Sequence, residues 1–206
     1  MKIGTEWMSI SDMMSGLMMI FLFIGISLML EVQNREATLS EIKSNLDKRL
    51  NREFSNEFKK WGIQDVKNNI VRFNSPRVSF NNNSDHISIE YKKILNEFYP
   101  KYIEILTSKD YKKYIKEIRI EGHTDSNYNQ KLSTGEGLIY NIDLSQRRAK
   151  NVLEYITTLN VFKKYEHFIQ TKTRVTGVGS AVPIINNHSE NKMLSRRVDF
   201  KVIINL

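Results

Sequence analysis

The chain begins with a long run of apolar residues that contains a single acidic side chain. The run extends from Trp7 to Leu30, and the eighteen residues from Met13 to Leu30 carry no charge. An apolar stretch of this length is typical of a helix that crosses a bilayer. Asp12 is the exception, because a carboxylate inside such a helix costs about 2.5–3.5 kcal/mol on insertion scales. A charge placed there usually acts on an ion or a proton, so Asp12 is the first candidate functional residue.

The neighbours of Asp12 give the predicted helix one face of small and polar side chains. Ser15 and Gly16 follow Asp12 at the helical spacing of three and four residues. Small residues let helices approach closely in lipid, so we expect this face to contact protein. A cleaved signal peptide is the alternative, but the run is too long and lacks a small-residue cleavage site. The sequence predicts a tail over residues 1–6 and a retained transmembrane helix over 7–30.

The rest of the chain divides into a helical segment and an α/β domain. Apolar positions recur at steps of three and four from residue 39 to residue 61, which predicts an amphipathic helical connector over 31–67. The connector either packs on its own domain or forms a coiled coil with a second copy. From residue 68 to residue 206, alternating and helical patterns interleave, which predicts a mixed sheet covered by helices. The predicted strands are 70–73, 78–80, 118–121, 174–179, which runs into a turn, and 198–204. The predicted helices are 91–105 and one capped by Asp143, after a loop at 127–140.

Composition excludes several classes of function. The net charge of +8 is spread among acidic residues and accompanies no nucleic-acid-binding motif, so no direct nucleic-acid partner is expected. The absence of cysteine excludes disulfides, thiolate metal sites and cysteine nucleophiles. The four histidines are scattered without ligand spacing, and neither a nucleophile–base pair nor a phosphate loop is visible. The sequence therefore predicts no enzyme, no metal site and no cofactor.

Four short motifs follow one another in the C-terminal part of the chain. They are Gly-His-Thr-Asp ending at Asp125, Asn-x-x-Leu-Ser-x-x-Arg-Ala from Asn141, Gly-x-Gly followed by proline over 177–183, and Ser-Arg-Arg-Val from Ser195. In this order they resemble the OmpA-like peptidoglycan-binding domain, and the resemblance covers about residues 70–204. Ser195 departs from the family, which has asparagine there.

The resemblance implies a binding site for the peptide of the cell wall. Asp125 and Arg148 match the pair that holds the diaminopimelate group. An aspartate with an arginine suits that group because it carries both an ammonium and a carboxylate. The positions that match the lining of the same site are Thr124, Asn141, Leu144 and Arg196. The alternative is an internal Asp125–Arg148 salt bridge without a ligand.

A membrane helix with an early aspartate, followed by an OmpA-like domain, resembles the B subunits of ion-driven rotary stators. These subunits occur in the flagellar motor and in the Zorya antiphage-defence motor. The resemblance implies that Asp12 binds and releases a transported ion, with Ser11 and Ser15 as neighbours of the ion site. Ile10 and Ser11 replace the family's Tyr-Ala pair, so the choice between H⁺ and Na⁺ stays open.

The same resemblance implies the partners and the location of the chain. Five copies of a polytopic A subunit would surround two copies of this chain in the bacterial inner membrane. The N-terminus would be cytoplasmic, and the C-terminal domain would be periplasmic and bound to peptidoglycan. The short tail and the five-residue spacing from Trp7 to Asp12 favour the Zorya type. A flagellar stator subunit and a non-conducting wall-anchoring protein are the alternatives.

Overall fold

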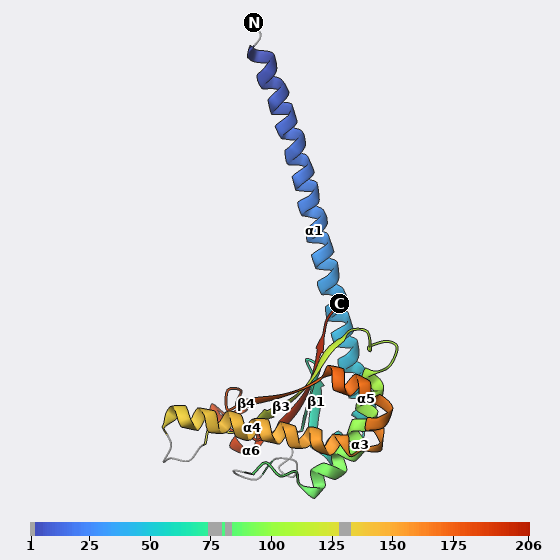
Figure 1. Ribbon diagram of the computed structural model, residues 1–206, viewed down its shortest axis with the longest axis vertical. Helices are drawn as coiled ribbons and strands as arrows, with labels where there is room; N and C mark the ends of the chain where they lie inside the picture. Colours follow the sequence, from blue (N-terminus) through green and yellow to red (C-terminus); the bar gives the residue numbers. More distant parts are fainter. Residues whose placement is uncertain (1–2, 74–79, 81–83, 128–132) are drawn as a thin grey trace. The chain divides into compact units, whose positions relative to one another are not determined.

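The chain forms two compact units, which a computed structural model describes over residues 3–73, 80, 84–127 and 133–206 (Figure 1). The first unit comprises residues 1–41 with Leu206, and the second comprises residues 42–205. Helix α1 (Ile3–Phe54) supplies all of the described structure of the first unit except Leu206. Its large apolar side chains are exposed from Ile10 to Val32, with Phe23 at 74 %. Among the described residues, α1 alone is long and apolar enough to cross a membrane.

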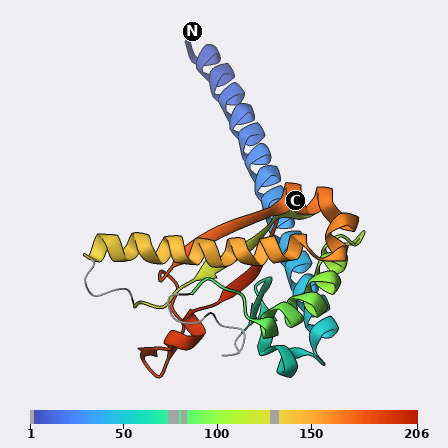
Figure 2. The ribbon, with the colours of Figure 1, turned by 60° about the horizontal axis from the view of Figure 1, so that its bottom comes forward.

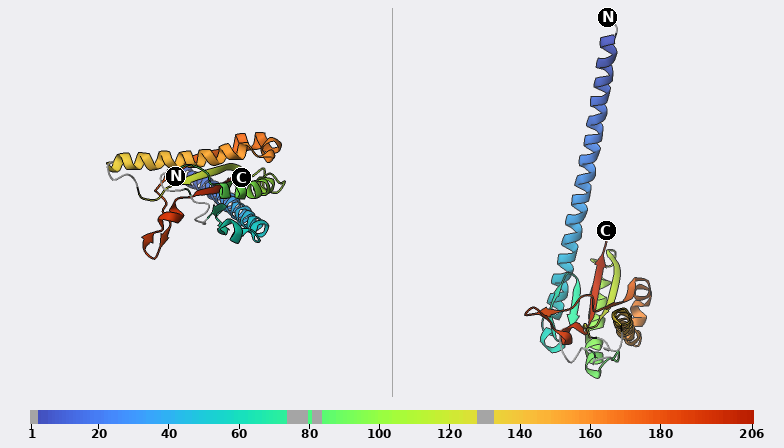
Figure 3. Two further views of the ribbon diagram at one scale, coloured as in Figure 1. Left: turned by 90° about the horizontal axis from the view of Figure 1, so that it is seen from below. Right: turned by 90° about the vertical axis from the view of Figure 1, so that its left-hand side faces the viewer.

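The second unit is built on a mixed five-stranded sheet. Its strand order is β1-β2-β7-β3-β4, and all neighbours are antiparallel except β3 and β4, which are parallel (Figure 3). The strands are β1 (Ile63–Lys67), β2 (Ile70–Phe73), β3 (Ile115–His123), β4 (Thr173–Gly179) and β7 (Val198–Ile204). A separate hairpin is formed by β5 (Ile185–Asn186) and β6 (Ser189–Glu190). The predicted fold class, an apolar helix followed by an α/β domain with a mixed sheet, is confirmed.

Helices and aromatic side chains enclose the sheet. The helices after α1 are α2 (Phe58–Trp61), α3 (Ile89–Leu106), α4 (Thr134–Thr157), α5 (Asn160–Lys172) and α6 (Lys192–Ser195). Figure 2 shows α4 lying along one side of the sheet. Phe98 of α3 is the centre of the aromatic core, with its ring centroid 5.2 Å from those of Phe54, Phe73 and Phe200. The last turns of α1 therefore belong to the core of the second unit.

The predicted connector over residues 31–67 differs from the structure in its last part. Helix α1 ends at Phe54, and Gly62 terminates α2 in the left-handed conformation at φ 67°. Residues 63–67 then form β1, which the side-chain amide of Asn51 holds through both backbone groups of Val66, at 2.8 and 2.9 Å. A strand of five residues after a helical pattern carries too little periodicity to be recognised. The predicted strand at 78–80 lies outside the described residues except for Phe80, which is buried.

Helix α4 begins nine residues before the predicted cap at Asp143. Ser133 accepts a hydrogen bond from the backbone of Glu136, and the Glu136 carboxylate accepts one from the backbone of Ser133. This reciprocal capping box fixes the start of the helix, although the glycines in the segment favour a loop. The prediction of a loop over 127–140 is therefore wrong for residues 134–140.

Two glycines let α4 approach the sheet more closely than any other residue would allow. A Cβ atom on Gly122 of β3 would lie 1.9 Å from the carbonyl oxygen of Ser145. A Cβ atom on Gly177 of β4 would lie 2.6 Å from the carbonyl oxygen of Ile142. Both obstacles are backbone atoms, which cannot move without displacing α4. The motif glycines therefore set the distance between the helix and the strand ends.

Gly122→Ala should lower the free energy of unfolding by roughly 1–3 kcal/mol or more, because the added methyl group pushes α4 off the sheet. The matched control is Gly135→Ala in the first turn of α4, where a Cβ atom meets nothing within 4 Å. The control should be neutral or stabilising by up to about 1 kcal/mol. Urea unfolding followed by the near-ultraviolet circular dichroism of the aromatic core measures both. Equal effects of the two substitutions would contradict the close-approach argument.

Candidate functional site

The four motifs meet at one end of the sheet, where β3 and β4 end and β7 begins. The backbone N–H of His123 donates to the carbonyl of Arg197 at 2.9 Å, and that of Thr124 donates to Gly179 at 2.9 Å. The Ser145 hydroxyl donates to the Ile142 carbonyl and accepts from the N–H of Gly179. These bonds connect all four motifs, so segments distant in the sequence form one site.

Asp125 forms its ion pair with Arg196. A guanidinium nitrogen, Nη1 of Arg196, lies 2.6 Å from Oδ2 of Asp125. The carboxylate side chain is only 4 % exposed, and that of Arg196 is 20 % exposed. The Asn141 side chain donates to the backbone carbonyl of Asp125 at 3.4 Å. A salt bridge internal to the protein therefore does hold Asp125, but its cation is Arg196, whereas the sequence had suggested Arg148.

Arg148 is fully buried and binds backbone carbonyls. Its Nε donates to Ser84 at 2.9 Å and its Nη1 donates to His123 at 3.1 Å, while its guanidinium lies 5.0 Å from the ring centroid of Phe80. Burial, and after it the positive charge of Arg196, lower the pKa of Arg148 to about 10, while the carboxylates of Asp125 and Asp85 act in the opposite direction. Arg148 stays charged at neutral pH. It therefore ties the segment before α3 to the end of β3 and places a buried positive charge beside the ion pair.

Two polar atoms beside the Asp125–Arg196 ion pair have no hydrogen-bond partner within the part of the chain that the structure describes. They are the hydroxyl oxygen of Thr124 and Nε of Arg196, and both atoms are buried. Unsatisfied buried polar atoms are uncommon in folded proteins, and each calls for a reason. Both belong to residues next to or paired with Asp125, so a bound polar group could satisfy them.

Two further residues of the motifs, Leu144 and Ser195, pack or bond within the protein beneath the site. Leu144 is buried on α4 at 3 % exposure and packs in the core. Ser195, which replaces the asparagine of the family pattern, accepts a hydrogen bond from the N–H of Ile184 at 3.0 Å. The replacement therefore still fixes the segment that follows the Gly-x-Gly turn.

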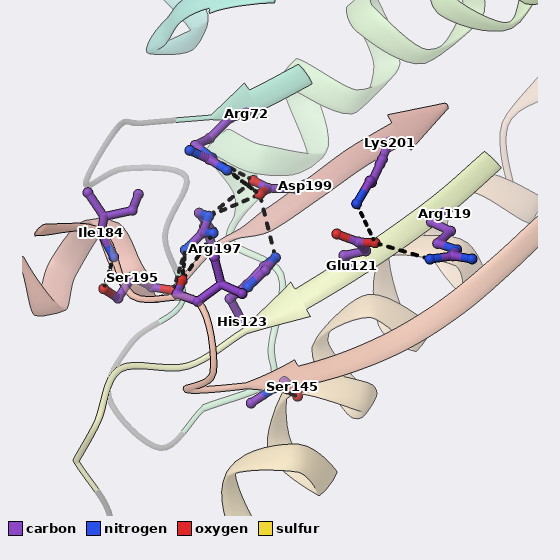
Figure 4. Close-up of polar contacts among 12 residues, drawn as sticks. Arg72, Arg119, Glu121, His123, Ser145, Ile184, Ser195, Arg197, Asp199 and Lys201 are labelled. Carbon is purple, nitrogen blue, oxygen red and sulfur yellow. Dashed lines mark hydrogen bonds and ion pairs between the residues drawn. The ribbon is translucent and has the colours of Figure 1, made fainter. Parts of the chain in front are cut away.

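A second charged cluster behind the site was missed by the sequence analysis. Figure 4 shows Asp199 held by Arg72 at 3.0 Å and by Arg197 at 3.1 Å, with the His123 ring 3.5 Å away. Arg197 directly precedes β7 and Asp199 lies within that strand, and Nε of Arg197 donates to the Asp199 carboxylate at 3.1 Å. Arg72 faces Asp199 across the β2–β7 register. Only the pairing of those strands, which the sequence does not show, brings the cluster together.

His123 is kept neutral by its surroundings. Burial is the largest cause and lowers the pKa of His123 to about 4, although Asp199 acts in the opposite direction. In the described residues, no group of three or more histidine or acidic side chains is arranged to hold a metal ion. His123 is thus a packed member of the cluster whose backbone carbonyl receives Arg148.

The second unit should lose stability as the pH falls from about 6.5 towards 4, because the unfolded chain then binds a proton that folded His123 does not. The expected loss from this group between about pH 7.5 and about pH 4.5 is roughly 2–3 kcal/mol. The His123→Gln variant has no titrating ring, so its free energy of unfolding should fall by roughly 2–3 kcal/mol less than that of the wild-type protein over the same pH range. Urea unfolding at both pH values measures the difference. An identical pH dependence of the two proteins would contradict the assignment.

On the Ile3–Glu41 part of α1, the candidate ion site has simple geometry. Asp12 is exposed on the helix surface, and the hydroxyl of Ser15 donates to the carbonyl of Ser11 at 2.9 Å. Ser11 and Ser15 therefore lie one turn apart on the same face, adjacent to Asp12. In the apolar stretch, the hydroxyl side chains within three residues of the carboxylate in the sequence are Ser9, Ser11 and Ser15.

Comparisons with known proteins agree with both units. Residues 79–197, more than half of the chain, match the OmpA family. The Zorya protein ZorB of the Crooks strain of Escherichia coli is 33 % identical over an alignment of 209 positions, which covers 97 % of this chain and 88 % of that protein. A MotB-like protein from Desulfovibrio vulgaris has the same fold, with a TM-score of 0.56 and 19 % identity over 82 % of this chain and 98 % of that one. The cell wall anchor of the T6SS from Pseudomonas aeruginosa has a TM-score of 0.51 and 18 % identity, over 77 % and 99 % of the two chains. The chain therefore belongs to the ZorB family and carries an OmpA-family domain.

Proposed function

We propose that this chain is the peptidoglycan-anchored B subunit of an ion-driven rotary stator that acts in Zorya-type antiphage defence. The similarity to ZorB carries the proposal because it spans 97 % of the chain and so includes both α1 and the OmpA-family domain. A wall-binding domain by itself would fit a passive anchor as well. A passive anchor, however, gives no reason for a carboxylate in the apolar run.

The membrane part of the proposal rests on α1. Its exposed apolar surface requires a bilayer or a partner, since such a surface is unfavourable in water. We place it as a single span of the inner membrane with a cytoplasmic N-terminus. Five copies of a polytopic A subunit would surround two copies of this chain. Ser15 and Gly16, which follow Asp12 on the helix, leave room for a partner helix to pack beside the carboxylate.

Asp12 has the chemistry that an ion carrier needs. A proton or a sodium ion neutralises the carboxylate and removes most of the penalty of holding it in the membrane. That penalty of about 2.5–3.5 kcal/mol is similar to the ~2.3 kcal/mol that one charge gains from each 100 mV of membrane potential. An ion gradient can therefore drive Asp12 through loaded and unloaded states. Ser11 and Ser15 would add polar atoms near the ion.

The wall-binding part of the proposal rests on the Asp125–Arg196 pair. A ligand with an ammonium and a carboxylate can substitute for the internal ion pair, because its ammonium pairs with Asp125 while its carboxylate pairs with Arg196. The charge of Arg148 also favours the carboxylate, and Thr124 offers an unsatisfied hydroxyl. Asn141 and Leu144 would shape the site from α4. The diaminopimelate group of peptidoglycan has this pair of charges, so we propose it as the ligand.

Asp12→Asn should abolish ion uptake and phage protection while leaving the complex with the A subunit assembled. The amide carries no charge, so it cannot bind and release a proton or a sodium ion as the carboxylate does. Glu6→Gln is the matched control, since it removes a carboxylate outside the uncharged stretch. Ion uptake by vesicles that contain both subunits, under a proton or a sodium gradient, measures the effect and identifies the ion. Full activity of Asp12→Asn would leave only the non-conducting anchor, and rescue of swimming in a strain without flagellar stators would favour the flagellar alternative.

Asp125→Asn should reduce retention on purified peptidoglycan by roughly tenfold or more, because a charged hydrogen bond in a buried site contributes about 1.5–3 kcal/mol. Asp143→Asn is the control on α4, where the carboxylate is 59 % exposed and pairs with Arg147. Co-sedimentation of the full chain with sacculi measures both. Equal retention of the two variants would refute the site without affecting the ion-carrier test.

A further inference from the structure

A groove lined by cations lies on the second unit, between the later turns of its α1 segment and the loop that precedes β3. Its volume is about 570 Å³. The cations that line this basic groove are Lys48, Arg49, Arg52, Lys109 and Lys113, all of them exposed. Asp110 is the one carboxylate among the lining residues. The groove therefore has a strong positive charge that the proposed stator function does not use.

The charge of the basic groove is available to a partner. Lys48, Arg52 and Lys109 form no ion pair with any residue that the structure describes, whereas Arg49 lies 3.5 Å from Glu53. The loop is held in shape by backbone bonds from Tyr114 and Ile115 to the carbonyl of Tyr111. The cations are thus set on a preformed frame, with half-buried tyrosines between them. Cations with interspersed tyrosines suit the headgroup region of an anionic bilayer.

We infer that the basic groove docks onto the anionic phospholipid headgroups of the membrane in which α1 is inserted. Chain connectivity favours this occupant over a soluble anion. Ile42, the first residue of the second unit, lines the groove, and the uncharged run ends at Leu30. Twelve residues reach at most about 40 Å even when fully extended. The bilayer is therefore present at a high effective concentration, which a free anion is not.

Docking in this way is compatible with wall binding. The loop that lines the groove precedes the first residue of β3, and Asp125 follows the last residue of that strand. Nine residues of strand separate the two sites by about 30 Å. A second unit that rests on the membrane through the groove would therefore present the Asp125 site away from the lipid. The inference goes beyond the stator function and depends only on insertion of α1.

Fluorescence quenching in vesicles tests the inference on the full chain. The chain has no cysteine, so Asn45→Cys, at the groove, accepts one environment-sensitive label. A lipid with a nitroxide headgroup should quench this label several-fold more in vesicles of equimolar phosphatidylglycerol and phosphatidylcholine than in phosphatidylcholine alone. The difference should vanish in 1 M salt, where the screening length falls to about 3 Å.

Two charge-removal variants separate the groove from overall charge. The groove variant is Lys48→Gln, Arg52→Gln, Lys109→Gln and Lys113→Gln; the control is Lys59→Gln, Lys92→Gln, Lys93→Gln and Lys150→Gln. The groove variant should lose the extra quenching, and the control should keep it. All eight side chains are exposed, so unchanged circular dichroism is expected for both.

Three results would overturn the inference. They are no effect of phosphatidylglycerol, equal loss in both variants, and displacement by soluble glycerol phosphate, which would indicate a site for small anions. Resistance of the protein to carbonate extraction reports insertion of α1 separately. Absence of the extra quenching in carbonate-resistant wild-type protein would contradict docking and leave the stator proposal intact.

Discussion

The close contact between α4 and the ends of β3 and β4 is the constraint on which the candidate wall site depends. Gly122 and Gly177 leave space for the backbone of α4, and the Ser145 hydroxyl bonds across that contact to Gly179. With the helix at this distance, Arg148 reaches the carbonyl of His123 and Asn141 reaches that of Asp125. Without this close contact, the polar residues of α4 would not reach those at the ends of β3 and β4.

The candidate wall site presents one negative and one positive side chain, Asp125 and Arg196, and this pair favours a ligand that carries both charges. Buried ion pairs are costly unless each member is matched, and here Asp125 and Asp199 each have an arginine partner. Arg148 donates to the carbonyls of Ser84 and His123 and adds a buried positive charge near the Asp125–Arg196 pair. A ligand with one charge would leave Asp125 or Arg196 unpaired, whereas a zwitterionic group matches both.

Local patterns made most of the second unit predictable. The strands at 70–73, 118–121 and 198–204 and the helix at 91–105 lie within β2, β3, β7 and α3, because alternation and helical periodicity are properties of neighbouring residues. The site motifs were also visible, since each is a short segment. The Asp125–Arg196 pair was not, because its members are 71 residues apart and meet only after the sheet has formed. The short strand β1 and the glycine-containing start of α4 were missed because local composition favoured other structures.

The two units divide the work of the proposed stator between them. The exposed apolar part of α1 carries one carboxylate, and the OmpA-family domain carries the proposed wall site. In the proposed stator, a domain fixed to the wall prevents the membrane helix from turning together with the ring of partner subunits. The most direct test is to bind the purified complex to peptidoglycan through this chain, label the A subunits, and apply an ion gradient. The account predicts rotation of the A subunits that stops when the gradient is dissipated. Ion flow without rotation about the immobilised chain would contradict it.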